Sequence, residues 1–180
     1  MALKIAKTFQ LKQPVEKAWV FLSDPRKVAA CVPGARITEQ IDAKHYTGTI
    51  SVDLGPSVTD YKGELEIVNP DAVNHSLELF GQGHDVKGRD SVSMKMTVEL
   101  HALAGGGTEV TGVSDLTMVG KLAQIDARII NEVSNILFGV FTKNLQERMD
   151  QPDDGSTPVE TKPISGSSLA WQAVKGLLGG

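Results

Sequence analysis

The side chains of this chain that could do acid–base or metal chemistry are few and scattered. His84 and Asp85 are neighbours, but neighbours on a strand point to opposite faces, so they cannot form a dyad by themselves. An exposed polar pair is the favoured interpretation. The other histidines, His45, His75 and His101, show no i, i+4 pairing and no carboxylate partner at ligand spacing. The sequence therefore predicts neither a catalytic site nor a metal site.

Two further features invite a chemical interpretation. Cys31, the chain's one cysteine, has no histidine nearby, and a small buried hydrophobic residue is favoured over a nucleophile. The stretch Gly81-Gln82-Gly83 is no dinucleotide fingerprint, because no helix follows it. It indicates either a bulge that bends a sheet or a point where a ligand approaches the backbone.

Composition excludes several classes of protein. The chain has 180 residues and a net charge of −4, with 18 basic and 22 acidic residues mixed along it. That balance argues against a nucleic-acid groove and against attraction to anionic lipid by charge alone. Lysines interrupt the N-terminal stretch where a signal peptide would need an apolar core, and no apolar run is long enough to span a membrane. We expect a cytoplasmic protein.

The elements follow from periodicity. Residues 2–11 alternate as a strand, Pro14 precedes a short helix, and Asp24 caps a second one that residues 31–35 break. About six antiparallel strands follow as a meander up to residue 119. Apolar residues then recur every three or four positions, which predicts one helix over 121–148, about 28 residues and roughly 42 Å long.

This order predicts an α+β protein with the helix-grip fold, and it resembles the START/Bet v1-like superfamily. A curved antiparallel sheet of about seven strands would wrap around the long C-terminal helix, accompanied by two short helices. We expect the folded domain to cover residues 1–149. Residues 150–168 are rich in proline and hydroxyl side chains and predict a flexible linker, and residues 169–180 form an amphipathic segment.

Two stretches of sequence point to one family within this superfamily. DPRKVAACVPGA (24–35) and VGKLAQIDARII (119–130) are similar to the signatures of the CoxG family, which is named for its association with carbon monoxide dehydrogenase. The glycine pair at 81–83 falls where that family has Gly-x-Gly. The match covers about residues 2–149. It departs at Asp126, where a small residue such as glycine is expected.

The resemblance implies an accessory protein, not an enzyme. The family accompanies molybdenum-containing carbon monoxide dehydrogenases and related hydroxylases, and it is associated with attaching the enzyme to the membrane. Respiratory quinone, with no covalent cofactor, is the ligand that suits this setting, and it would couple the enzyme to the respiratory chain by electron transfer. Two alternatives stay open: a recruitment module without a functional ligand, and a helix-grip enzyme.

The ligand is expected between sheet and helix. The candidate lining residues are Val52, Leu54, Phe80, Met94, Met96, Ile125, Ile129, Val133 and Phe141, with Tyr61 and Gln124 as hydrogen-bond partners of a quinone carbonyl. Methionines suit a flexible isoprenoid tail, because they adapt to irregular shapes. For any one of the apolar residues, an ordinary filled core is the alternative.

The C-terminal segment is the candidate membrane contact. Its apolar arc holds Leu169, Trp171, Val174, Leu177 and Leu178. It is too short to span a bilayer, so it would lie in the interface of the cytoplasmic membrane or dock on a membrane protein. The alternative is that it folds back on its own domain. We expect a cytoplasmic protein peripherally associated with the cell membrane.

Overall fold

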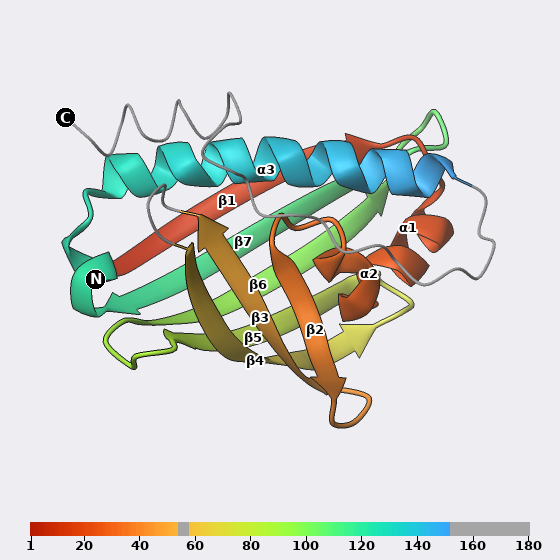
Figure 1. Cartoon of the computed structure of the whole chain (residues 1–180). Coiled ribbons are helices and arrows are strands. Elements are labelled where there is room, and N and C mark those ends of the chain that lie inside the picture. Colours follow the sequence, from red (N-terminus) through yellow and green to blue (C-terminus); the bar gives the residue numbers. More distant parts are fainter. Residues whose placement is uncertain (54–57, 152–180) are drawn as a thin grey trace.

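The computed structural model describes residues 1–53 and 58–151, apart from the side chains of residues 52, 53, 58 and 59 (Figure 1). The elements in this part of the chain are β1 (Ala2–Leu11), α1 (Val15–Leu22), α2 (Pro25–Ala29), β2 (Ala35–Gln40), β3 (His45–Asp53), β4 (Val58–Asp71), β5 (Ser76–Asp85), β6 (Ser91–Ala102), β7 (Thr108–Val119), the 3-10 turn η1 (Gly120–Gln124) and α3 (Ala127–Asp150).

The strands form one curved antiparallel sheet. Its order is β1-β7-β6-β5-β4-β3-β2, so β2 to β7 follow one another as a meander and β1 pairs with β7. Figure 1 shows α3 running alongside β1, with α1 and α2 near the C-terminal end of α3. The helix-grip architecture, with about seven strands and two short helices, is confirmed.

Phe9 identifies the face of the sheet that α3 covers. Its ring lies edge-on to the rings of Phe138 and Phe141, with centroid distances of 5.6 and 6.2 Å. Directly paired residues of antiparallel strands project from the same face. The pairing of Phe9 with Val110, and of Val110 with Leu100, therefore extends this inner face across the sheet. The opposite side is the outer face.

The stretch 24–35 folds as a capped turn of helix that is tied to α3. The Asp24 side chain accepts a hydrogen bond from the Arg26 N–H at 3.0 Å, as expected of the N-cap. Gly34 ends the stretch with φ +77°, a conformation that favours glycine. Asn144 of α3 donates to the Cys31 carbonyl at 3.1 Å, so this first motif helps to fix where the long helix lies.

The second motif breaks into two pieces, and the prediction of one uninterrupted helix over 121–148 is wrong at its start. Residues 120–124 form η1, and α3 begins only after Asp126. The Asp126 side chain accepts a hydrogen bond from the Arg128 N–H at 2.8 Å, so it is the N-cap of α3. The residue that departs from the family pattern therefore sets the first turn of the helix.

Gly120 allows this change of direction. Its φ is +86°, and a Cβ placed there would lie 2.3 Å from the Arg89 carbonyl oxygen and 2.5 Å from Asp90 Oδ1. The next N–H, that of Lys121, donates to the same Asp90 oxygen at 2.6 Å. The chain entering α3 is thus held against the turn between β5 and β6.

We predict that Gly120→Ala lowers the free energy of unfolding by at least about 1–2 kcal/mol, the cost of a left-handed backbone for a residue with a Cβ. Gly139→Ala is the matched control, because no atom lies within 4 Å of the added Cβ on α3. It should raise stability by about 1 kcal/mol, since alanine favours a helix over glycine. Chemical denaturation of both variants tests the pair, and equal effects would contradict the role of Gly120.

Candidate functional site

The inner face is filled at one end and incompletely filled at the other. The buried core lies where α1, α2 and the C-terminal part of α3 meet the sheet, and it consists of Leu11, Ala18, Trp19, Cys31, Leu77, Leu100, Val110, Leu145 and Met149. Further along the same face, Leu65, Val92, Met94, Met96 and Leu116 are only half-buried. These side chains lie on the helix side of the sheet and still reach solvent, so α3 does not cover them completely.

Helix α3 packs on the core with the side of Phe141 and Leu145. One flank next to that side is polar and the other is apolar. On the polar flank, Asn135 bonds to Lys7 of β1 and Gln146 accepts from the Lys12 N–H at 3.3 Å. The apolar flank is on the side of Asn144, which reaches the segment after α2. Leu137, which is 38% exposed, lies on this flank, while the half-buried residues Ile129, Val133 and Val140 lie further round the helix, on the side away from Phe138.

Met94 and Met96 lie on the inner face, as predicted. Ile129 and Val133 are half-buried on α3, on the side of the helix away from Phe138, and their place in the lining stays a prediction. Phe141 instead packs against the buried core. Ile125 is half-buried in the short connection between η1 and α3.

Phe80 does not belong to this set, and its assignment to the lining is wrong. It pairs with Glu66 on one side and Lys95 on the other, all on the outer face, and it is 44% exposed. Its neighbours Leu79 and Gly81 are the inner-face residues. Gln124 is also exposed, in η1, so it is no part of the inner face.

The tyrosines Tyr46 and Tyr61 bring polar groups to the inner face. Tyr61 is half-buried, and burial, with Asp90 and Asp85 nearby, raises the pKa of its phenol. It therefore stays protonated at neutral pH and can donate a hydrogen bond. Tyr46, which the sequence analysis missed, is buried and accepts from Gln40 Nε2 at 3.3 Å. Its position in the β3 alternation was the signal that could have identified it.

Asp85 is buried, so the prediction of an exposed polar pair with His84 is wrong for this residue. His84 is exposed, whereas Asp85 retains 2% exposure at the end of β5. Its Oδ1 accepts from the Arg89 N–H at 2.6 Å and from the Asp90 N–H at 3.0 Å, and its Oδ2 lies 3.6 Å from Arg89 Nε. The carboxylate stabilises the β5–β6 turn against which Gly120 packs. The two residues do point to opposite faces, as expected.

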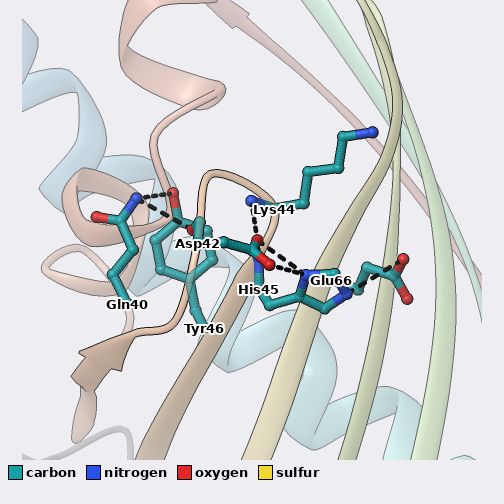
Figure 2. Close-up of polar contacts among 6 residues, drawn as sticks. All are labelled: Gln40, Asp42, Lys44, His45, Tyr46 and Glu66. Carbon is teal, nitrogen blue, oxygen red and sulfur yellow. Dashed lines mark hydrogen bonds and ion pairs between the residues drawn. The ribbon is translucent and has the colours of Figure 1, made fainter.

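His45 has carboxylate partners that its sequence position did not suggest (Figure 2). One ring nitrogen, Nδ1, lies 2.8 Å from Asp42 Oδ1, and Nε2 lies 3.5 Å from Glu66 Oε1. The hydrogen bond to Asp42 raises the pKa of His45, and backbone bonding to Lys44 is the main cause that lowers the pKa of Asp42. The group is exposed on the outer face, away from the half-buried apolar residues, and it closes the β2–β3 turn.

Cys31 is fully buried, and burial raises the pKa of its thiol to about 11. The thiol is protonated at neutral pH, which fits the expected small hydrophobic residue and not a nucleophile. In the described ranges no group of three or more His, Cys, Asp or Glu side chains could hold a metal ion. No helix within those ranges is long and apolar enough to cross a membrane.

The glycine pair at 81–83 forms no bulge. Strand β5 stays in register with β4 and β6 through both glycines, which lie on the inner face. The bulge interpretation is therefore wrong. Among the other predicted site residues, Val52 lies in β3, while Leu54 and the tail residues Leu169, Trp171, Val174, Leu177 and Leu178 lie outside the described residues.

Solved structures define the class of fold. A conserved protein from Geobacillus kaustophilus is 22% identical, with 82% of this chain and 95% of that chain covered and a TM-score of 0.73. A START superfamily protein from Mycobacterium smegmatis is 12% identical, with 82% and 97% covered and a TM-score of 0.61. The Zhui aromatase/cyclase from Streptomyces is 11% identical, with 83% and 92% covered and a TM-score of 0.54. The chain therefore has the START-like helix-grip fold, which alone does not decide between binding and catalysis.

The match to a protein family is more specific than the match to the fold. The model of the carbon monoxide dehydrogenase CoxG family matches residues 8–150, nearly the whole folded part. The chain belongs to this family, as the stretches 24–35 and 119–130 indicated. None of the curated proteins compared with the chain matches it.

We predict that Asp85→Asn lowers the melting temperature by several degrees at neutral pH. Hydrogen bonds from the Asp90 and Arg89 N–H groups hold the pKa of Asp85 below its ordinary value. The stabilisation is therefore present above the unfolded pKa and is lost as pH falls through the folded pKa.

Melting curves of wild type and Asp85→Asn between neutral and acid pH give the test. The gap between them should narrow on acidification, because the wild-type carboxylate is then neutral too. A gap that stays constant would contradict the assignment.

Proposed function

We propose that this protein binds a respiratory quinone between its sheet and α3, as an accessory protein of a molybdenum-containing carbon monoxide dehydrogenase or related hydroxylase. It passes electrons toward the respiratory chain by holding quinone within reach of that enzyme. It is recruited to the membrane by its C-terminal segment. Membership of the CoxG family supports the partner, and the half-buried apolar inner face supports a hydrophobic ligand.

One observation carries the ligand proposal: apolar residues that face α3 remain half-buried while a closed core exists at the other end of the same face. Burying apolar surface contributes roughly 25 cal/mol per Å², so a ligand that covers Met94 and Met96 gains affinity from side chains that the fold leaves partly exposed. Isoprenoid chains are flexible, and methionine side chains adapt to such shapes.

The polar groups of the inner face support binding in preference to catalysis. Asp85 is engaged by the β5–β6 turn, and the His45 group lies on the outer face. Tyr61 presents a protonated phenol, which suits donation to a carbonyl oxygen. General acid–base catalysis needs a titrating group near the operating pH, and a phenol with a raised pKa does not meet that need.

We predict that Ile129→Trp and Val133→Trp each reduce quinone uptake at least tenfold, because an indole at either half-buried position of α3 would occupy volume that the proposed ligand uses. Overpacking should cost about 1–3 kcal/mol of stability and leave the fold intact. Purified protein is incubated with decylubiquinone or phylloquinone, extracted with organic solvent and analysed by mass spectrometry.

Glu132→Trp is the matched control, since Glu132 is exposed on the same turn of the helix. It should retain wild-type uptake. Full uptake by both tryptophan variants would place the ligand elsewhere, and no uptake by wild type would favour a recruitment module without a ligand.

We predict that deleting residues 152–180 abolishes membrane association and leaves melting temperature and quinone uptake nearly unchanged. Gln151 is kept because its N–H donates to the Arg148 carbonyl and ends α3. Trp171→Ala in the full chain should cause most of the loss, since tryptophan favours membrane interfaces. Sedimentation with lipid vesicles measures the association. A large drop in melting temperature with vesicle binding retained would make the segment part of the fold.

A further inference from the structure

The inner face carries glycines of two kinds. At Gly48 and Gly63 an added Cβ would lie 2.6 Å from a backbone carbonyl oxygen of the neighbouring strand, so close backbone approach demands glycine there. At Gly81 and Gly83 the nearest atom to an added Cβ is 3.5 Å away, which is ordinary contact. Gly112, on the same face, has no atom within 4 Å of that position.

Backbone conformation does not explain why Gly81, Gly83 and Gly112 are glycines. Gly81, Gly83 and Gly112 lie inside regular strands whose register is continuous, and none has a positive φ. Glycine inside a strand is destabilising relative to alanine, because it loses more conformational freedom on folding. The chain therefore lacks a side chain at these positions although alanine would fit. Gly112 has open space above it, while at Gly81 and Gly83 the flexible ends of the Met94 and Val92 side chains are among the nearest atoms.

The space above Gly81 and Gly83 has a defined border. Gly81 is paired with Leu65 on one side and Met94 on the other, and Gly83 is next to Val92. Tyr61 is paired with Asp85, the next inner-face residue beyond Gly83 on β5. Within the described residues its hydroxyl has no hydrogen-bond partner, so a protonated donor lies beside two glycines that are edged by apolar side chains. The Met94 methyl reaches to 3.5 Å from a Cβ built on Gly81, and a ring bound there would move this flexible side chain aside.

We propose that Gly81 and Gly83 form the floor of a subsite for the flat ring of a quinone, with the Tyr61 hydroxyl donating a hydrogen bond to one ring carbonyl. A ring can lie flat only where no Cβ rises from the strand beneath it. The isoprenoid chain then runs over Met94 and Met96 toward the open position at Gly112. This subsite rests on the proposed function and adds where the headgroup lies and what recognises it.

Valine substitutions of the two glycines test the floor. Gly81→Val and Gly83→Val should each weaken binding of decylubiquinone or phylloquinone at least tenfold in a titration of the full-length protein. Gln82→Val is the matched control, because it adds the same side chain to the same strand on the outer face, and its affinity should stay within twofold of wild type.

Gly81→Ala and Gly83→Ala show whether lost binding is due to misfolding, since the added Cβ fits sterically and the fold should be kept. They should keep or raise the melting temperature and still weaken binding about threefold or more. If both alanine and valine variants bind like wild type, the floor assignment is overturned. If wild type itself takes up neither probe, the proposed function has failed, which is a different result.

Infrared spectroscopy of the bound quinone tests the carbonyl contact. Bound to wild type, one carbonyl stretch should move to lower frequency than the other, and Tyr61→Phe should abolish this difference. Gly112→Val should weaken binding of the chain-bearing probe and keep the carbonyl difference, because it obstructs the chain and not the ring. An unchanged spectrum in Tyr61→Phe, or a lost carbonyl difference in Gly112→Val, would overturn the proposed orientation.

Discussion

One helix is too narrow to cover the inner face of this sheet, and most features of the molecule depend on that mismatch. An α-helix with its side chains is about 10–12 Å across. Seven strands at their usual spacing span roughly 29 Å. Curvature brings the strands around α3 but does not remove the difference, so part of an apolar face must be covered by something else or stay open. Here α1 and α2 cover one end, where the buried core lies, and the other end stays half-buried.

The position of α3 decides which part stays open. Polar contacts hold it from two sides: the Lys7 side chain of β1 and the Lys12 N–H just after β1 on one side, and the Cys31 carbonyl beyond α2 on the other. Its entry is fixed where Gly120 meets the β5–β6 turn, which the buried Asp85 stabilises. The helix is thus held over β1, at one edge of the sheet, and it leaves apolar side chains further across the inner face half-buried. The two motifs that resemble the family are the two segments that hold the helix there.

Periodicity was enough to predict the strands and the general architecture, because alternation is strict where one face of a sheet is buried. The errors arose where a residue departs from the alternation or satisfies backbone groups. Phe80 is apolar but out of phase with Leu77 and Leu79, and its parity alone places it on the outer face. The sequence predicts an exposed Asp85 and places Asp126 inside the long helix, whereas both side chains accept backbone N–H groups that would otherwise lack partners. The spatial pairing of His45 with Glu66 needs the β3–β4 register, which alternation does not supply.

The distribution of sulfur in the fold has a consequence for oxidative damage. Peroxide reacts with cysteine as the thiolate, and the single cysteine is fully buried and protonated. Met118 and Met149 are buried as well, while Met94 and Met96 on the inner face are only half-buried. Conversion of those two thioethers to sulfoxides would make an apolar wall polar without touching the core. The fold would then survive an oxidant that alters the inner surface, and methionine sulfoxide reductase could restore that surface only if it reached the two side chains.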